Sequence, residues 1–76
     1  MIKVTLGTTT TRKEYITKKD QIIKDFLDEH NVIITNELSI KLDGMNLDEH
    51  SLNRTFDDFD LEDECMLVVV VNSKNA

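Results

Sequence analysis

The stretch RTFDDFDLEDECMLVVVV, residues 54–71, contains the most strand-like segment of the sequence. Its last six residues, 66–71, are all apolar and mostly β-branched, as is typical of a central strand that is covered on both faces. The preceding residues, 48–64, are largely polar, so we expect a surface connection with one or two short helical turns. Four apolar side chains would anchor this connection to the core: Leu52, Phe56, Phe59 and Leu61.

Four other segments show strand-like patterns. Residues 2–6 alternate apolar and polar side chains, and residues 11–17 can return beside them as the second strand of a hairpin. Residues 37–44 alternate again and end in the turn dipeptide Asp-Gly, after which residues 45–47 can form a short return strand. Residues 32–35 fit either a packed loop or a short strand.

A helix is predicted over residues 19–30. Its apolar side chains recur at helical spacing and form one stripe: Ile22, Ile23, Phe26 and Leu27. Thr17 and Asp20 have the spacing of a capping box, which would mark the start of the helix. Asn31 is a fair stop signal.

Together these segments predict an α+β fold in the order β-β-α-β-β. A mixed sheet of four or five strands would carry one main helix across one face, which buries one amphipathic helix against one sheet. We expect a single domain over residues 1–72 and a short polar tail at residues 73–76.

Composition narrows the class of protein. Cys65 is the only cysteine, so an internal disulfide is excluded. The longest apolar run is much shorter than the roughly 20 residues of a membrane-spanning helix, and no secretory signal pattern precedes the first strand. We therefore expect a cytoplasmic protein with no membrane partner.

Charge is distributed unevenly along the chain. The net charge is −6, but residues 1–24 carry a net +4 and residues 25–76 a net −10. Such asymmetry can steer a charged partner, although a solvated surface explains it equally well. The sequence has no sustained basic patch with aromatic residues near it, so we expect no nucleic-acid partner.

The final third also resembles a known family. Arg54 and Thr55 are followed by an apolar residue, an aspartate, an aromatic residue, an acidic turn and a closing apolar strand. This order resembles the ubiquitin-like β-grasp family, and six residues are identical to ubiquitin's: Arg54, Thr55, Asp58, Glu64, Leu67 and Val70. The turn at residues 43–47 and the first strand fit the same pattern. The resemblance implies the ubiquitin-like β-grasp fold.

Two departures from the family's pattern bear on function. Conjugating and sulfur-carrier relatives end in Gly-Gly, whereas this sequence ends in Asn75-Ala76 and its only glycines are Gly7 and Gly44. If the sequence is complete, the chain is neither a modifier nor a sulfur carrier. Family members often bind partners through an exposed sheet face centred on an isoleucine, and Lys41 takes that position here.

The resemblance therefore implies an altered binding face. If Leu67, Val69 and Val71 point inward, the alternate positions of the last strand face the exposed side of the sheet. The candidate partner-binding residues are Val68, Val70, Lys41, Lys3 and Thr5, with Ser39 beside them. Plain β-propensity on a central strand is the alternative explanation for the two valines.

Candidate chemistry is sparse. Cys65, His30 and His50 include a thiol and two imidazoles, but the predicted elements place them apart and supply no orienting group. The carboxylates of residues 57–64 lack the glycine and glutamate positions of a calcium loop. We therefore expect no catalytic residues, no metal, no cofactor and no enzyme activity. The acidic residues form a candidate surface: Asp57, Asp58, Asp60, Glu62, Asp63 and Glu64.

Two functions follow from these patterns. The first is a non-conjugating ubiquitin-like protein–protein interaction module, analogous to the small bacterial ubiquitin-like proteins associated with secretion systems. The second is an acidic inhibitor or mimic, of a kind carried by mobile elements, that blocks a basic site on another protein. Self-association is a further option, because an edge at the hairpin or at residues 37–42 can pair between copies.

Overall fold

Short strands and helical turns make up the described part of the chain, residues 1–72 of this computed structural model. The strands are β1 (Ile2–Gly7), β2 (Arg12–Thr17), β3 (Leu38–Leu42), β4 (Met45–Leu47) and β5 (Glu64–Val71). The helices are α1 (Ile23–Glu29), α2 (Glu49–Leu52) and the 3-10 turn η1 (Phe56–Phe59). The predicted polar tail, residues 73–76, lies outside the described residues.

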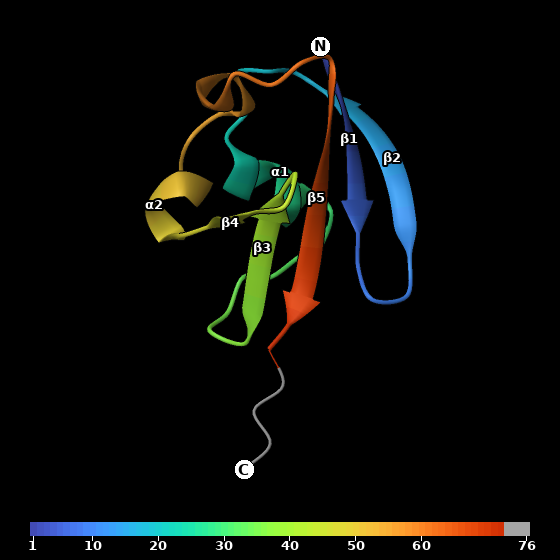
Figure 1. Cartoon of the computed structure of the whole chain (residues 1–76), viewed down its shortest axis with the longest axis vertical. Coiled ribbons are helices and arrows are strands. Elements are labelled where there is room, and N and C mark those ends of the chain that lie inside the picture. The colour runs from blue at the N-terminus through green and yellow to red at the C-terminus, as the bar shows by residue number, and fades with distance from the viewer. Residues whose placement is uncertain (73–76) are drawn as a thin grey trace.

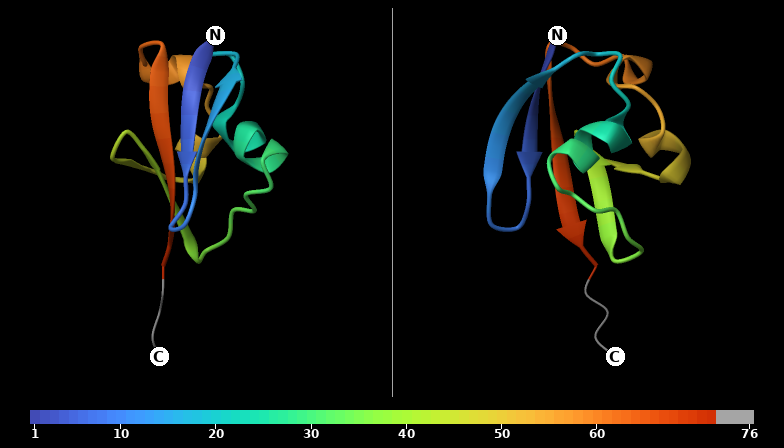
Figure 2. Two further views of the ribbon diagram at one scale, coloured as in Figure 1. Left: turned by 90° about the vertical axis from the view of Figure 1, so that its right-hand side faces the viewer. Right: turned by 180° about the vertical axis from the view of Figure 1, so that it is seen from behind.

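The strands form one five-stranded mixed sheet in the order β2-β1-β5-β3-β4. β5 runs parallel to β1 and antiparallel to β3, so the prediction of a central final strand is confirmed. α1 packs across one face of the sheet, and Figure 1 views the sheet from the opposite face. Figure 2 shows the sheet and α1 as two layers. The predicted α+β class and its β-β-α-β-β order are confirmed.

The core lies between the sheet and α1. The strands contribute alternate side chains, as the pleat requires, and α1 contributes its apolar stripe. The most deeply buried side chains are Phe26, Phe56, Ile2, Ile23, Leu27, Leu42, Leu67 and Val4. Val71 faces the same side of the sheet as Leu67 but is 56% exposed, because the end of β5 extends beyond α1.

The helix is shorter than predicted, and the prediction of its start was wrong. α1 begins at Ile23, and Ile22 instead has extended backbone and bridges to Thr55. The carbonyls of Lys19 and Gln21 accept hydrogen bonds from the N–H groups of Asp57 and Phe56, at 2.8 and 3.2 Å. These contacts hold residues 19–22 against η1, so they cannot form a first helical turn.

A capping box does occur, but at η1. The Thr55 side chain accepts a bond from the N–H of Asp58, and the Asp58 carboxylate accepts one from the N–H of Thr55 at 3.1 Å. Thr17 and Asp20 have the same spacing in the sequence, but they do not cap α1. The expected anchors of this connection are in place: Leu52 and Phe56 are buried, and Phe59 and Leu61 are half-buried against the core.

The segment of residues 32–35 is a loop. The N–H of Val32 bonds to the carbonyl of Leu27 at 2.9 Å, which closes the end of α1. The edges of the sheet are β2 and β4. Of the expected edge at residues 37–42, the short β4 pairs with residues 40–42 only, and residues 38–39 of β3 have no strand beside them on that side within residues 1–72. No helix within residues 1–72 is long and apolar enough to cross a membrane.

Candidate functional site

The exposed face of the sheet, opposite α1, gathers all five predicted partner-binding residues. Strand register determines which side chains lie side by side there. Val68 pairs with Gly7 of β1 on one side and with Lys41 of β3 on the other. Gly7 in turn pairs with Arg12 of β2. One row across the sheet therefore runs Arg12, Gly7, Val68 and Lys41, and it ends at Asn46 of β4.

This central row is amphipathic. Val68 is half-buried. Lys41 is its neighbour on β3, and Arg12 follows beyond Gly7 on the other side. Gly7 has no side chain, and a Cβ built there would find only the Leu67 carbonyl within 4 Å, at 3.9 Å. The row therefore has room for a Cβ at Gly7, although neighbouring groups already bury the glycine itself. Within residues 1–72, no ion pair involves Arg12 or Lys41.

Val70 lies one row further along, opposite Ser39. The Ser39 hydroxyl donates to the Oδ1 of Asn72 at 3.0 Å and accepts from its Nδ2 at 2.8 Å. The N–H of Asn72 bonds to the carbonyl of Glu37. These bonds fix the end of β5 to the start of β3, so Val70 sits on ordered backbone.

Lys3 is placed on this face, but other residues already engage its ammonium group. The Nζ atom lies 3.4 Å from a Glu64 carboxylate oxygen and 3.8 Å from one of Glu14. Both pairs are exposed, so each contributes little to stability. Glu64, which was predicted to belong to the acidic surface, therefore lies in β5 on the sheet face beside Lys3. Thr5 lies in the next row, between Glu14 and Met66.

Sequence reasoning missed several members of this face, among them Gly7, Arg12 and Met66. Side chains alternate between the two faces along a strand, so Met66 faces the same side of the sheet as Val68 and Val70. This alternation in the sequence could have identified Met66. Met66 is held firmly, because its N–H donates to the Asp43 carboxylate and its carbonyl accepts the N–H of Asp43, both at 2.9 Å. Gly7 and Arg12 could be placed only from the register between strands.

The acidic residues occupy a separate surface. Asp57 and Asp58 belong to η1, and the exposed Asp60, Glu62 and Asp63 follow it. The carboxylate of Asp58 is committed to the Thr55 cap. Asp63 lies 3.9 Å from Lys19. Among residues 1–72, no three His, Cys, Asp or Glu side chains converge as metal ligands would.

The structure separates the thiol from both imidazoles. Cys65 is buried in β5, where its register partner is Val4 of β1. The ring of His30 stacks on Tyr15 at a centroid distance of 3.9 Å, and His50 contacts the guanidinium of Arg54 at 3.2 Å. Burial and, to a smaller extent, the Asp43 carboxylate together raise the pKa of the Cys65 thiol to about 11. A raised pKa is the opposite of what an activated thiol needs.

Proteins similar to this chain are found by comparison of structures and not by comparison of sequences. No family model and no curated protein matches the sequence. The fold superimposes on the ubiquitin-like domain of an Arabidopsis thaliana protein with a TM-score of 0.72 at 18% identity, covering 99% of this chain and 81% of that one. The chain has the ubiquitin-like fold.

Two more ubiquitin-like structures support this assignment. The N-terminal ubiquitin-like domain of the 4931431F19Rik protein has a TM-score of 0.66 at 17% identity, covering 99% of this chain and 78% of that one. A ubiquitin-like protein from the hyperthermophilic archaea Caldiarchaeum subterraneum has a TM-score of 0.64 at 9% identity, covering 97% and 100%. At these identities the ubiquitin-like fold is shared, whereas the chemistry of the exposed face belongs to this chain.

Proposed function

We propose that the chain is a non-conjugating ubiquitin-like protein–protein interaction module of the cytoplasm, with no catalytic role. The observation that supports this most is the central row of the exposed face, where the half-buried Val68 lies between the cations Arg12 and Lys41, with Gly7 separating it from Arg12. An apolar centre with a charged rim is the usual anatomy of a protein interface. The complementary partner would present an apolar side chain to Val68 and carboxylates to the two cations.

The non-conjugating part of the proposal is supported by the positions of the glycines. Gly7 is inside β1 and Gly44 is in the turn between β3 and β4, where its φ of 89° favours glycine. No two glycines are adjacent in residues 1–76. Trimming within this sequence therefore exposes no diglycine terminus for an activating enzyme.

Val70→Asp tests the proposal directly. Val70 lies on the same face in the row next to Val68, so a carboxylate buried there by a partner is expected to weaken binding by about 30-fold or more. Val71→Asp is the matched control, because Val71 is the next residue, is 56% exposed and has the opposite parity. Wild-type, Val70→Asp and Val71→Asp baits are compared by affinity capture from native lysate and mass spectrometry, after circular dichroism shows that all three are folded.

A partner retained by wild type and Val71→Asp but lost with Val70→Asp supports the sheet-face module. Equal retention by all three baits contradicts it. The same spectra test the non-conjugating proposal, because a covalent adduct carrying the carboxyl terminus of this chain would disprove it.

An acidic inhibitor is the second candidate. Asp57, Asp60 and Glu62 are exposed, lie within one short connection and make no ion pair within residues 1–72. Binding through this acidic surface would persist in Val70→Asp and weaken steeply with salt, because exposed charges are screened within roughly 10 Å at 0.1 M salt. A partner that survives the mutation but elutes at moderate salt supports this candidate.

A further inference from the structure

The turn between β3 and β4 is tied to the start of β5 by a side chain in place of a backbone group. Leu42 pairs with Leu67 in the β3–β5 ladder, so Asp43 and Met66 would form the next antiparallel pair. The N–H of Asp43 does donate to the Met66 carbonyl, at 2.9 Å. The N–H of Met66, however, donates to the Oδ1 of Asp43 at 2.9 Å. The Asp43 carboxylate therefore occupies the position that a backbone carbonyl would otherwise take in the ladder.

The same turn is an Asp-Gly dipeptide in which both residues have a positive φ. The φ is 49° at Asp43 and 89° at Gly44, as a two-residue hairpin turn of this kind requires. A Cβ built on Gly44 would find nothing within 4 Å. Within residues 1–72, the N–H of Gly44 makes no hydrogen bond. An unhindered backbone nitrogen therefore follows directly after the Asp43 carboxyl group.

An aspartate that precedes a glycine can convert to isoaspartate with water as the only other reactant. The Gly44 nitrogen attacks the Cγ of the protonated Asp43 carboxyl group. A C–N bond forms, and the carboxyl hydroxyl leaves as water with the amide proton. One water then opens the resulting succinimide ring. When it cleaves the bond between the nitrogen and the original backbone carbonyl, the chain runs through Cγ and the residue becomes isoaspartate. Cleavage of the other C–N bond restores aspartate.

We propose that Asp43–Gly44 is a modification site, where isoaspartate forms while the turn is detached from β5, and that the two bonds to Met66 suppress this reaction in the folded chain. The bond to the Met66 N–H holds the carboxylate toward β5, whereas ring closure needs the Cγ atom to lie against the Gly44 nitrogen. Local opening of the turn releases the side chain. The modification therefore marks chains in which this turn has been open.

The product does not restore the contact with β5. Isoaspartate adds one carbon to the backbone between residues 43 and 44, and the length of a hairpin turn sets the register of its strands. Its free carboxyl group is attached directly to Cα, one carbon closer to the backbone than in aspartate. Both changes move the carboxylate away from the Met66 N–H. The free α-carboxyl group also makes the modified turn a substrate for carboxyl methyltransferases that recognise isoaspartate.

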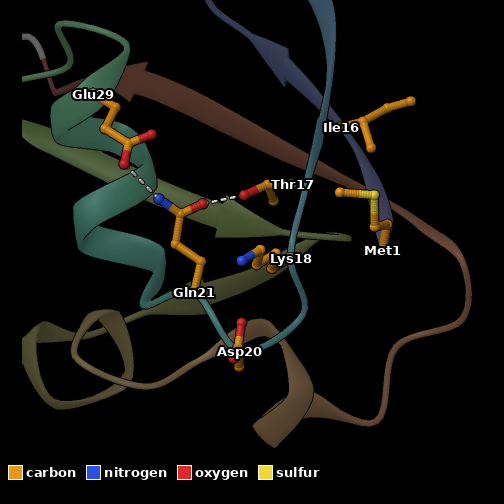
Figure 3. Close-up of a pocket in the computed structure, with 7 residues that line it drawn as sticks. All are labelled: Met1, Ile16, Thr17, Lys18, Asp20, Gln21 and Glu29. Carbon is orange, nitrogen blue, oxygen red and sulfur yellow. Dashed lines mark hydrogen bonds between the residues drawn. The ribbon is translucent and has the colours of Figure 1, made fainter.

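Two other aspartates provide internal controls. Asp60 is exposed and has a positive φ of 53°, but the side chain of Leu61 hinders attack by the nitrogen that follows it. Asp20 is exposed and borders the groove of Figure 3, where Gln21 follows it. The N–H of Gln21 already donates to a backbone carbonyl at 3.1 Å, and its side chain bonds to Glu29 at 2.8 Å. Neither site offers a free and unhindered nitrogen.

The test follows isoaspartate formation in the full chain at neutral pH, in buffer and in denaturing urea. Electron-transfer fragmentation of the digested chain distinguishes isoaspartate from aspartate of equal mass. At residue 43 we expect formation to be roughly tenfold or more faster in urea, because native hydrogen bonds hold the turn closed in buffer. In urea, Asp43 should convert faster than Asp60 and Asp20. Gly44→Ala should remove most of that difference, and in urea the strain of a Cβ at positive φ has no effect.

NMR of the isolated isoaspartate product tests the contact with β5. After refolding of the ¹⁵N-labelled chain, the Met66 amide should lose its protection from hydrogen exchange. Val68, whose partner in β3 is Lys41, should keep its protection. The proposal is overturned if residue 43 converts as fast in buffer as in urea, if either control aspartate converts as fast as Asp43 in urea, or if the product keeps Met66 protected. No readout involves a partner, so the result is independent of the proposed sheet-face function.

Discussion

Replacing Phe56 with alanine is expected to remove most of the stability of the fold. Phe56 is fully buried and packs edge-to-face on Phe26 at a centroid distance of 5.6 Å. Truncating a buried phenylalanine costs about 3–5 kcal/mol. A core of this size supplies only roughly 3–5 kcal/mol in total. The variant should therefore be largely unfolded in buffer without denaturant.

Urea denaturation followed by far-ultraviolet circular dichroism measures this effect. Phe59→Ala is the matched control, because Phe59 ends the same helical turn but is only half-buried. We expect it to lower the free energy of unfolding by about 1–2 kcal/mol while the protein stays folded. Similar unfolding midpoints for Phe56→Ala and Phe59→Ala would contradict the position of Phe56 at the centre of the core.

The thiol of Cys65 is expected to react about 100-fold more slowly in the native protein than in urea at pH 8. Burial, with a smaller contribution from the neighbouring Asp43 carboxylate, raises its pKa from 9.0 to about 11. The thiolate, which is the reactive form, is therefore scarce in the folded state. A chromogenic disulfide reagent measures both rates on the same sample.

The same shift predicts that stability falls in alkali. The folded pKa is higher than the unfolded value, so the contribution is fully present below pH 9 and is lost as the pH rises through about 11. The loss amounts to roughly 1–3 kcal/mol. Other groups also titrate there, so Cys65→Ala is the reference, and only the difference between the two unfolding curves counts. A difference that does not change between pH 8 and 11 would contradict the raised pKa.

The sequence predicted the strands well because their signals are local. Alternation at residues 2–6 and 37–42 and the apolar run at 66–71 required no tertiary knowledge. The start of the helix could not be predicted in this way. Residues 19–22 form backbone contacts with η1, more than thirty residues away, and those contacts override the capping signal at Thr17.

The candidate site was predicted in part for a related reason. Parity along one strand predicted Val68 and Val70, because side chains alternate across a sheet. Parity along one strand says nothing about which residues of other strands lie beside them. Arg12 lies in the row of Val68 only through Gly7, across two strand pairings of opposite direction. The ion pairs that engage Lys3 depend on the same pairings.

The position of β5 at the centre of the sheet has a consequence for synthesis. The β1–β2 hairpin and the β3–β4 hairpin do not border one another in the sheet, and β5 alone joins them. On a ribosome, both hairpins emerge before β5. Until β5 emerges, β1 and β3 each lack their second neighbouring strand. Two-stranded hairpins are only marginally stable alone. Cooperative folding of this domain must therefore wait until Val71 has cleared the exit tunnel, and until then β1 and β3 are open to aggregation or to chaperones.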